Sequence, residues 1–143
     1  MKKKFTVMFL CTGNSCRSQM AEGLARHYRG EDFDAYSAGT APQTLNPDAV
    51  IVMRELGIDI SQHYSKDISQ LGDISFDYLI TVCGEANEAC PVWPGRGEVI
   101  HRGFDDPPRL AKGAKTEEER LAPYRRVRDE IKEYILSLSF QER

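Results

Sequence analysis

The feature that most constrains the fold is an apolar run that ends in a polar loop and is followed at once by helical spacing. Residues 4–10 read KFTVMFL, which is typical of a central strand covered on both faces. From Ser18 onward, Met20, Leu24 and Tyr28 recur at the spacing of one helix face. This order of strand, loop and helix predicts the first unit of a parallel α/β sheet.

The same alternation continues along the chain. Residues 32–39, 76–82 and 97–104 are rich in β-forming residues and predict three further strands. Asn46 followed by Pro47 predicts the start of a second helix, because asparagine caps helices and proline suits their first position. The apolar stripe of a last helix comprises Val127, Ile131, Tyr134, Ile135 and Leu138. We therefore expect one α/β domain over residues 1–143, with a four-stranded parallel sheet flanked by helices.

Composition excludes several classes of protein. The chain has 143 residues, 41% of them hydrophobic, and a formal net charge of −3, which suits one globular core without disulfides. A pI near 5.6 argues against broad nucleic-acid binding, so an anionic ligand needs a local set of donors. No run approaches the roughly 20 apolar residues of a membrane span, and the first residues do not read as a secretion signal. We expect a soluble, cytoplasmic monomer that binds neither nucleic acid nor membrane.

Ligands of parallel α/β sheets bind beyond the carboxyl ends of the strands. This rule selects the loop that starts at Cys11, the segment that starts at Cys83 and the loop that starts at Asp105. All three contain reactive residue types. We expect residues 105–119, with adjacent prolines and many charges, to form a mobile surface loop.

The loop at Cys11 reads CTGNSCRSQMAEG and is suited to holding a tetrahedral oxyanion. A loop that leaves a strand and enters a helix can point successive backbone N–H groups inward, at the positive end of the helix. Gly13 supplies the backbone freedom for such a curl, and Asn14 tolerates left-handed conformations better than most residues. Arg17 can close the cradle, because its planar fork matches two oxygens of a phosphate-like anion.

Cys11 lies at the base of this cradle and is the candidate nucleophile. Positive potential there favours its thiolate, and we expect its pKa to fall from ~8.5 toward the ~3.5–7.5 of activated cysteines. Ser18 is expected either to donate a hydrogen bond to that sulfur or to cap the helix. Cys16 belongs to the loop but reads as a buried packing residue. The predicted oxyanion-binding residues are Thr12, Gly13, Asn14, Ser15, Cys16, Arg17 and Ser18.

The alternative reading of this loop is that Cys11 packs as a small hydrophobe while Arg17 pairs on the surface. A Cys-x5-Arg pattern between a strand and a helix is too specific for that reading. It is neither a Walker loop, which needs Gly-Lys-Ser/Thr, nor a dinucleotide fingerprint. We therefore interpret Cys11 as a nucleophile directed at an anion.

These motifs resemble those of a known family. CTGNSCRSQMAEG looks like the active-site loop of the low-molecular-weight tyrosine phosphatase fold, and in particular of its thioredoxin-coupled arsenate reductases. The likeness extends through YSAG, NPDA, DIS-x-H, TVCG, GFDDP and RRVRDEI. It implies an enzyme of arsenic detoxification that reduces arsenate to arsenite, with thioredoxin as external reductant and no bound cofactor. The loop by itself leaves phosphatase and reductase unresolved.

Two further cysteines bear on this choice. Hydrolysis of a phosphoester needs one thiolate, whereas reduction of arsenate needs two electrons and so turns two thiols into a disulfide. The run VCGEANEACP places Cys83 and Cys90 seven residues apart. If the run is helical, their Cα atoms lie ~10.5 Å apart. A disulfide needs roughly 7 Å or less, so bonding the pair requires the segment to unwind.

The resemblance implies a relay through three thiols. Cys11 attacks arsenate, and Cys83 then attacks Cys11, which releases arsenite and leaves a disulfide between them. Cys90 next attacks Cys83, which frees Cys11 and leaves a disulfide that thioredoxin reduces. The alternative functions are a low-molecular-weight protein tyrosine phosphatase that uses Cys11, Arg17 and Asp106 alone, and a sensor of oxyanions or redox state without turnover.

Packing and zinc binding are the other roles open to these cysteines. Cys83 and Cys90 could be buried packing residues, as free cysteines often are. The spacing of Cys11 and Cys16 suits zinc, but Cys83 and Cys90 are farther apart than the usual ligand pair. A zinc ion on Cys11 would also consume the nucleophile. We expect no bound metal.

Loss of water from the tetrahedral centre needs a proton donor. Asp105 and Asp106 precede Pro107, which restrains the backbone. The resemblance places the general acid at Asp106, directly before the proline, with Asp105 as the fallback. We expect a dense anion beside Asp106 to raise its pKa, which suits an acid. Pro108 stands where tyrosine phosphatases typically have a tyrosine for an aryl substrate, which weakens the phosphotyrosine alternative.

Some arsenate reductases of this type bind potassium beside the loop. Three positions of that site match Asn14, Glu22 and Ser37, but Lys66 replaces the aspartate at the fourth. An ammonium group cannot coordinate a cation, but it can deliver positive charge to Glu22 directly. We predict no potassium requirement, although Asp67 is only one residue away.

Overall fold

The computed structural model describes residues 4–71, 74–83 and 97–140. Its strands are β1 (Phe5–Cys11), β2 (Phe33–Gly39), β3 (Tyr78–Cys83) and β4 (Glu98–Phe104). Its helices are α1 (Arg17–Arg29), α2 (Pro47–Arg54), the 3-10 helix η1 (Ile68–Leu71), α3 (Pro107–Leu110) and α4 (Glu117–Ser137).

The four strands form one parallel sheet in the order β2-β1-β3-β4, which confirms the predicted fold class. The order places β1 and β3 side by side at the centre, so the two strands that end in Cys11 and Cys83 are neighbours. The pairing of β3 with β4 shifts register after Thr81, and Cys83 lies opposite Phe104. Such a shift next to a site re-aims the side chains around it.

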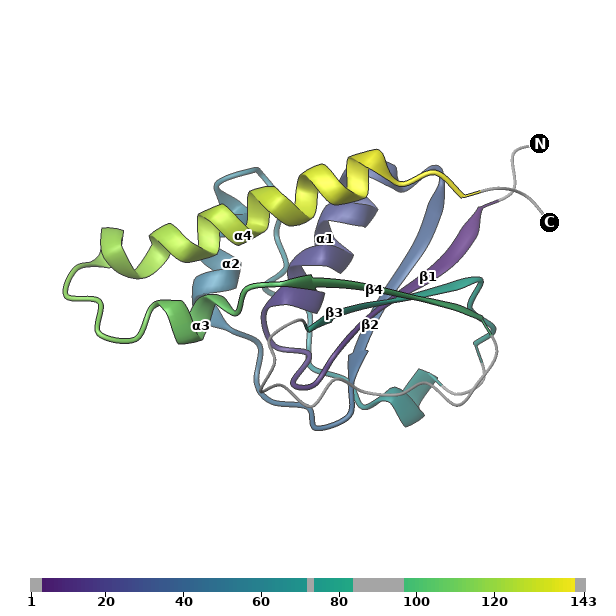
Figure 1. The fold of residues 1–143 in the computed structure, drawn as a ribbon, viewed down its shortest axis with the longest axis horizontal. Coiled ribbons are helices and arrows are strands. Elements are labelled where there is room, and N and C mark those ends of the chain that lie inside the picture. Colours follow the sequence, from purple (N-terminus) through teal and green to yellow (C-terminus); the bar gives the residue numbers. More distant parts are fainter. Residues whose placement is uncertain (1–3, 72–73, 84–96, 141–143) are drawn as a thin grey trace.

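The two faces of the sheet are covered differently. Val7, Phe9 and Cys11 of β1 belong to the main core, which also contains apolar residues of α1, α2 and α4. The alternate residues Met8 and Leu10 belong to a smaller core with Leu71 of η1 and Phe76. Figure 1 shows α4 running beside α1 on one side of the sheet, with η1 on the other. Because strand side chains alternate between faces, Cys11 lies on the helix-covered face.

The helices begin where the local sequence predicts. The Asn46 side chain accepts hydrogen bonds from the first turn of α2, and Pro47 is the first helical residue. The prediction of one surface loop over residues 105–119 is wrong in part, because α3 lies within it and α4 begins at Glu117. Thr116 caps α4, which explains the early start of this helix. Among the described residues, no helix is both long and apolar enough to cross a membrane.

Gly39 allows the end of β2 to touch the loop between β1 and α1. A Cβ atom at this position would overlap the carbonyl oxygen of Thr12 and lie 2.9 Å from that of Cys11. Both contacts are with backbone, which cannot rotate away. Gly57 is different, because its φ is +77° but no described residue other than its chain neighbours has an atom within 4 Å of the added Cβ.

Gly39→Ala should therefore lower the free energy of unfolding by about 1–3 kcal/mol and also weaken oxyanion binding by the neighbouring loop, because the methyl group must displace that loop. Gly57→Ala is the matched control. It should lower stability by about 1–2 kcal/mol through its left-handed backbone but leave anion binding intact. Denaturant titration and phosphate titration calorimetry measure the two effects. Normal anion binding by Gly39→Ala would contradict the prediction.

Candidate active site

The loop between β1 and α1 forms one wall of a cavity of about 290 Å³. The lining residues are Cys11, Thr12, Gly13, Asn14, Ser15, Cys16, Arg17, Gln43, Asn46, Asp106 and Pro108. The cavity thus brings together the predicted nucleophile, the predicted acid and every predicted oxyanion-binding residue except Ser18. These groups come from two loops that are far apart in the chain.

The carbonyl oxygens of the loop are bound by the segment that follows β2. Three backbone N–H groups of this segment donate to carbonyl oxygens of the loop. The pairs are Ala41 to Thr12 at 2.9 Å, Gln43 to Gly13 at 2.9 Å and Asn46 to Ser15 at 3.0 Å. In a planar trans peptide the C=O and N–H bonds point in opposite directions. Binding the carbonyls on one side therefore leaves the N–H side of these peptides for an anion.

Asn14 is the bend of the loop and has φ of +47°, which confirms its predicted left-handed conformation. Its Oδ1 atom accepts from the backbone N–H of Lys66 at 2.9 Å and from Nε2 of Gln19 at 3.0 Å. Its Nδ2 atom donates to the hydroxyl of Ser18 at 2.8 Å. The predicted capping role of Ser18 is wrong, because the N-cap of α1 is Cys16 and has no side-chain cap. Ser18 lies within the first helical turn instead.

Arg17 joins the cradle to the acid loop. Its guanidinium donates to the carbonyl oxygen of Phe104 at 2.9 Å and lies 3.8 Å from Oδ1 of Asp106. Arg17 is only 5% exposed, so its charge is held in a region of low dielectric. Phe104 is also the residue opposite Cys83 in the sheet. One side chain thus connects the anion cradle, the acid and the strand pair that carries the second cysteine.

The cysteines differ in their states. Cys11 and Cys16 are buried and form no disulfide. Burial raises the pKa of the Cys16 thiol, which agrees with its interpretation as an inert packing residue. Cys83 is buried in the same core cluster as Cys11 and is disulfide-bonded. Cys90 lies outside the described residues, so its part in the predicted relay stays a prediction.

The two aspartates before Pro107 occupy different environments. Asp106 lines the cavity, and its side chain is 29% exposed. The side chain of Asp105 is 55% exposed and forms an ion pair of 2.9 Å with Arg126 on α4. This difference favours Asp106 over Asp105 as the proton donor. Pro108 also lines the cavity, where it offers no aromatic ring to stack on an aryl substrate.

A buried cluster of charged side chains lies next to the loop between β1 and α1. The carboxylate of Glu22 is 2% exposed and accepts the hydroxyl hydrogen of Ser37 at 2.7 Å. It lies 3.2 Å from the Arg26 guanidinium and 3.8 Å from Nζ of Lys66. His63 lies 3.5 Å away, and burial lowers the pKa of its imidazole. The four positions of the potential potassium site therefore do meet, with an ammonium group at the fourth.

Gln43 and Asn46 are cavity residues that the sequence interpretation did not include. The signal that finds them is the rule that ligands bind beyond the carboxyl ends of strands, because residues 40–46 follow the end of β2. Asn46 is harder to recognise as a cavity residue, because its role as a helix cap is by itself a sufficient reason for an asparagine before a proline.

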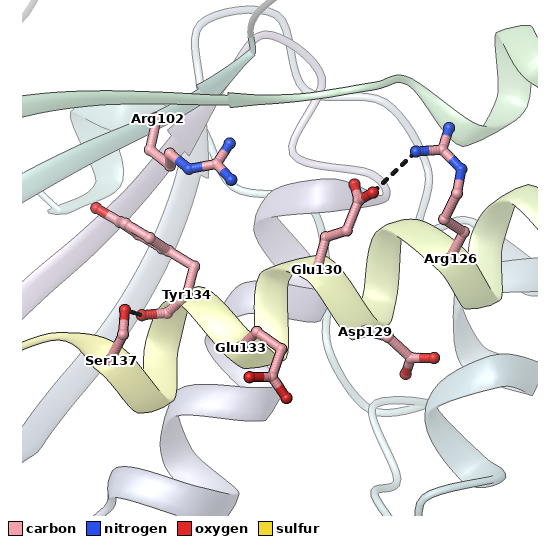
Figure 2. A pocket seen from close by; sticks show the side chains of 7 residues that line it. All are labelled: Arg102, Arg126, Asp129, Glu130, Glu133, Tyr134 and Ser137. Atoms are coloured by element: carbon pink, nitrogen blue, oxygen red, sulfur yellow. Dashed lines mark hydrogen bonds and ion pairs between the residues drawn. The ribbon is translucent and has the colours of Figure 1, made fainter.

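A larger cavity of about 620 Å³ lies between β4 and α4 (Figure 2). Its lining residues are Arg102, Arg126, Asp129, Glu130, Glu133, Tyr134 and Ser137. The Arg102 guanidinium lies over the ring of Tyr134, 5.5 Å from its centroid, and Arg126 pairs with Glu130 at 3.0 Å. Among the described residues, no cysteine and no predicted site residue lines it, so the smaller cavity is the candidate active site.

Comparisons with known proteins agree with this geometry. The family model described as low molecular weight phosphotyrosine protein phosphatase matches residues 6–141. An arsenate reductase of Halalkalibacterium halodurans is 51% identical over 131 residues, which cover 92% of this chain and 91% of the relative.

Solved structures show the same likeness. An arsenate reductase in the phosphate binding state is 32% identical, with a TM-score of 0.74 and coverage of 95% of each chain. A thioredoxin-dependent arsenate reductase of Corynebacterium glutamicum is 25% identical with a TM-score of 0.65, covering 93% of this chain and 58% of that one. The chain therefore belongs to the low-molecular-weight phosphotyrosine protein phosphatase family and, within it, to the arsenate reductases.

Proposed function

We propose that this arsenate reductase works through Cys11, Cys83 and Cys90 in succession, with thioredoxin as the final electron donor. The observation that carries the proposal is that a reduced cysteine, Cys11, and a buried arginine, Arg17, line one small cavity together with Asp106. Arg17 lines the cavity, and its guanidinium favours an anion there. A second redox-capable sulfur, that of Cys83, lies in the same core.

The first step forms a bond between sulfur and arsenic. The Cys11 thiolate attacks the arsenic of arsenate, and one arsenate hydroxyl group takes a proton from Asp106 and leaves as water. Arg17 and the loop N–H groups compensate the charge on the remaining oxygens. Arsenic is still pentavalent in this adduct, so no electron has yet been transferred.

The second step is the reduction. The Cys83 thiolate attacks the sulfur of Cys11, and the electron pair of the sulfur–arsenic bond passes to arsenic, which leaves as trivalent arsenite. The adjacent positions of β1 and β3 support this order, because both strands end at the same edge of the sheet. Cys90 then attacks Cys83 and releases the thiolate of Cys11.

Thioredoxin is the proposed reductant because a disulfide between Cys83 and Cys90 must pass its two oxidising equivalents to an external dithiol. Attack by one thiolate of that dithiol forms a mixed disulfide, and its second thiol resolves it. This exchange returns both protein thiols. A thioredoxin-dependent arsenate reductase among the similar structures supports the choice.

Lys66 is proposed to take the place of potassium. The Oδ1 atom of Asn14 is already used by two N–H donors, and the Ser37 hydroxyl is bound to Glu22. The remaining carboxylate charge faces Arg26 and the ammonium group of Lys66. Burial lowers the pKa of Lys66, and the carboxylate of Glu22 opposes this by favouring the charged form. The residues present do not fit a potassium ion.

Replacing a relay cysteine, as Cys83→Ser or Cys90→Ser, should abolish multiple turnover of arsenate in an assay that couples thioredoxin and its reductase to NADPH oxidation. Serine cannot form a disulfide, so the oxidised enzyme is not regenerated. Slow hydrolysis of an aryl phosphate should persist in both variants, which shows that the cavity is intact. Undiminished arsenate turnover by either variant would refute the relay.

Asp106→Asn should lower arsenate turnover by about 10²–10⁴-fold, because an amide cannot donate the proton that the departing oxygen needs. Asp105→Asn is the matched control, since that side chain pairs with Arg126 on the surface. Its turnover should stay near that of the unmodified protein. Steady-state kinetics of the two variants provide the comparison, and an equal loss in both would rule out the assignment of the acid.

Exchange of sodium for potassium at constant ionic strength should leave arsenate turnover unchanged, because Lys66 already supplies the positive charge beside Glu22. Lys66→Asp should make turnover depend on potassium, since it replaces the ammonium group with an oxygen ligand. Lys66→Gln is the control, because it removes the positive charge without adding a carboxylate ligand for potassium. Several-fold stimulation of the unmodified protein by potassium would overturn this prediction.

A further inference from the structure

Asn46 stands where the cavity wall, the start of α2 and the middle of α4 meet. Its backbone N–H donates to the carbonyl oxygen of Ser15 at 3.0 Å. Its Oδ1 atom accepts from the backbone N–H groups of Asp48 at 2.8 Å and Ala49 at 3.1 Å. Its Nδ2 atom donates to the hydroxyl of Tyr124 at 3.1 Å. The side-chain amide is therefore held from two sides.

These contacts fix which end of the amide carries the donors. A flipped amide would place its NH₂ group against two backbone N–H donors, which repel it. The amide oxygen has both acceptor positions filled, whereas the nitrogen has two hydrogens and uses one on Tyr124. Among the described residues, the second hydrogen has no protein acceptor, although Asn46 lines the cavity that contains Cys11 and Arg17.

Tyr124 keeps the amide in this orientation. It is 3% exposed, and burial raises its pKa to about 12, so its hydroxyl stays neutral at physiological pH. The hydroxyl belongs to a buried side chain of α4. The two N–H bonds of a planar amide diverge by a wide angle, so one bond directed at Tyr124 turns the other toward a different neighbour.

We propose that Asn46 is a substrate-binding residue, which donates its second Nδ2 hydrogen to an oxygen of the tetrahedral anion held over Cys11. Tyr124 is the positioning residue that orients this donor. The inference deepens the proposed function and rests on it, because it takes the cavity as the site of arsenate. A neutral donor adds a contact to the charged oxyanion but little to uncharged arsenous acid, so it favours binding of the substrate over the product.

The test is calorimetric titration of the full chain with inorganic phosphate, which probes anion binding without turnover. Asn46→Ser should weaken phosphate binding by about tenfold or more, because a hydrogen bond to a charged group is lost. Asn46→Asp should weaken it further, because a carboxylate repels the anion. Serine and aspartate both cap helices, so neither variant should unfold α2. The KM for arsenate should rise in both.

A second pair of variants separates loss of a helix cap from loss of the proposed contact with the anion. Thr116→Ala removes the cap of α4, whose Thr116 hydroxyl accepts from Glu119, and should lower the melting temperature without changing phosphate affinity. Tyr124→Phe should weaken phosphate binding in the unmodified chain but have no further effect in Asn46→Ser, because the two residues act through one hydrogen bond. A full additional loss in the double variant would exclude the positioning role.

The outcomes separate this inference from the proposed function. Phosphate binding by Asn46→Ser and Asn46→Asp as tight as that of the unmodified protein overturns the role of Asn46 and leaves the relay standing. Absence of phosphate binding by the unmodified protein removes the anion site itself and both proposals with it. Weaker binding in the two Asn46 variants, with melting temperatures unchanged, supports the direct contact.

Discussion

The site depends on the hydrogen bonds that hold the carbonyl oxygens of residues 12–15 away from the cavity. The segment after β2 supplies most of these donors through its own backbone, and Gly39 lets it come close enough to do so. Because these carbonyls are bound elsewhere, the N–H sides of the same peptides remain available for the proposed anion. Donors that are in place before an anion binds are the condition for electrostatic catalysis.

The strained point of this loop is stabilised by buried polar groups rather than by apolar packing. Asn14 has a left-handed backbone and no exposed surface, and its side chain is bound by Gln19 and Lys66. Beneath it, the buried carboxylate of Glu22 is compensated by two cations and a hydroxyl. A buried charge without such partners would be costly, so the cluster forms as a unit. It joins α1 to the segment before η1 and thereby supports the loop.

Local spacing was sufficient to predict much of this molecule. The strand before Cys11, the helix after it and the cap at Asn46 each follow from residues a few positions apart, and the structure has all three. The parallel sheet followed from the alternation of these units, because consecutive parallel strands need a helical crossover. The pattern from Cys11 to Arg17 also predicted the anion cradle, since a short loop between a strand and a helix has few ways to fold.

Only the tertiary structure decided which distant groups complete that cradle. Arg17 bonds to Phe104, and Asn46 meets Tyr124, across separations of 87 and 78 residues. No periodicity or motif contains such a pairing, because it depends on how α4 and the end of β4 pack against the loop. The sequence by itself thus determined the strand–loop–helix unit and the candidate nucleophile that it holds. Packing between remote elements determined the walls of the cavity and the partners of its charges.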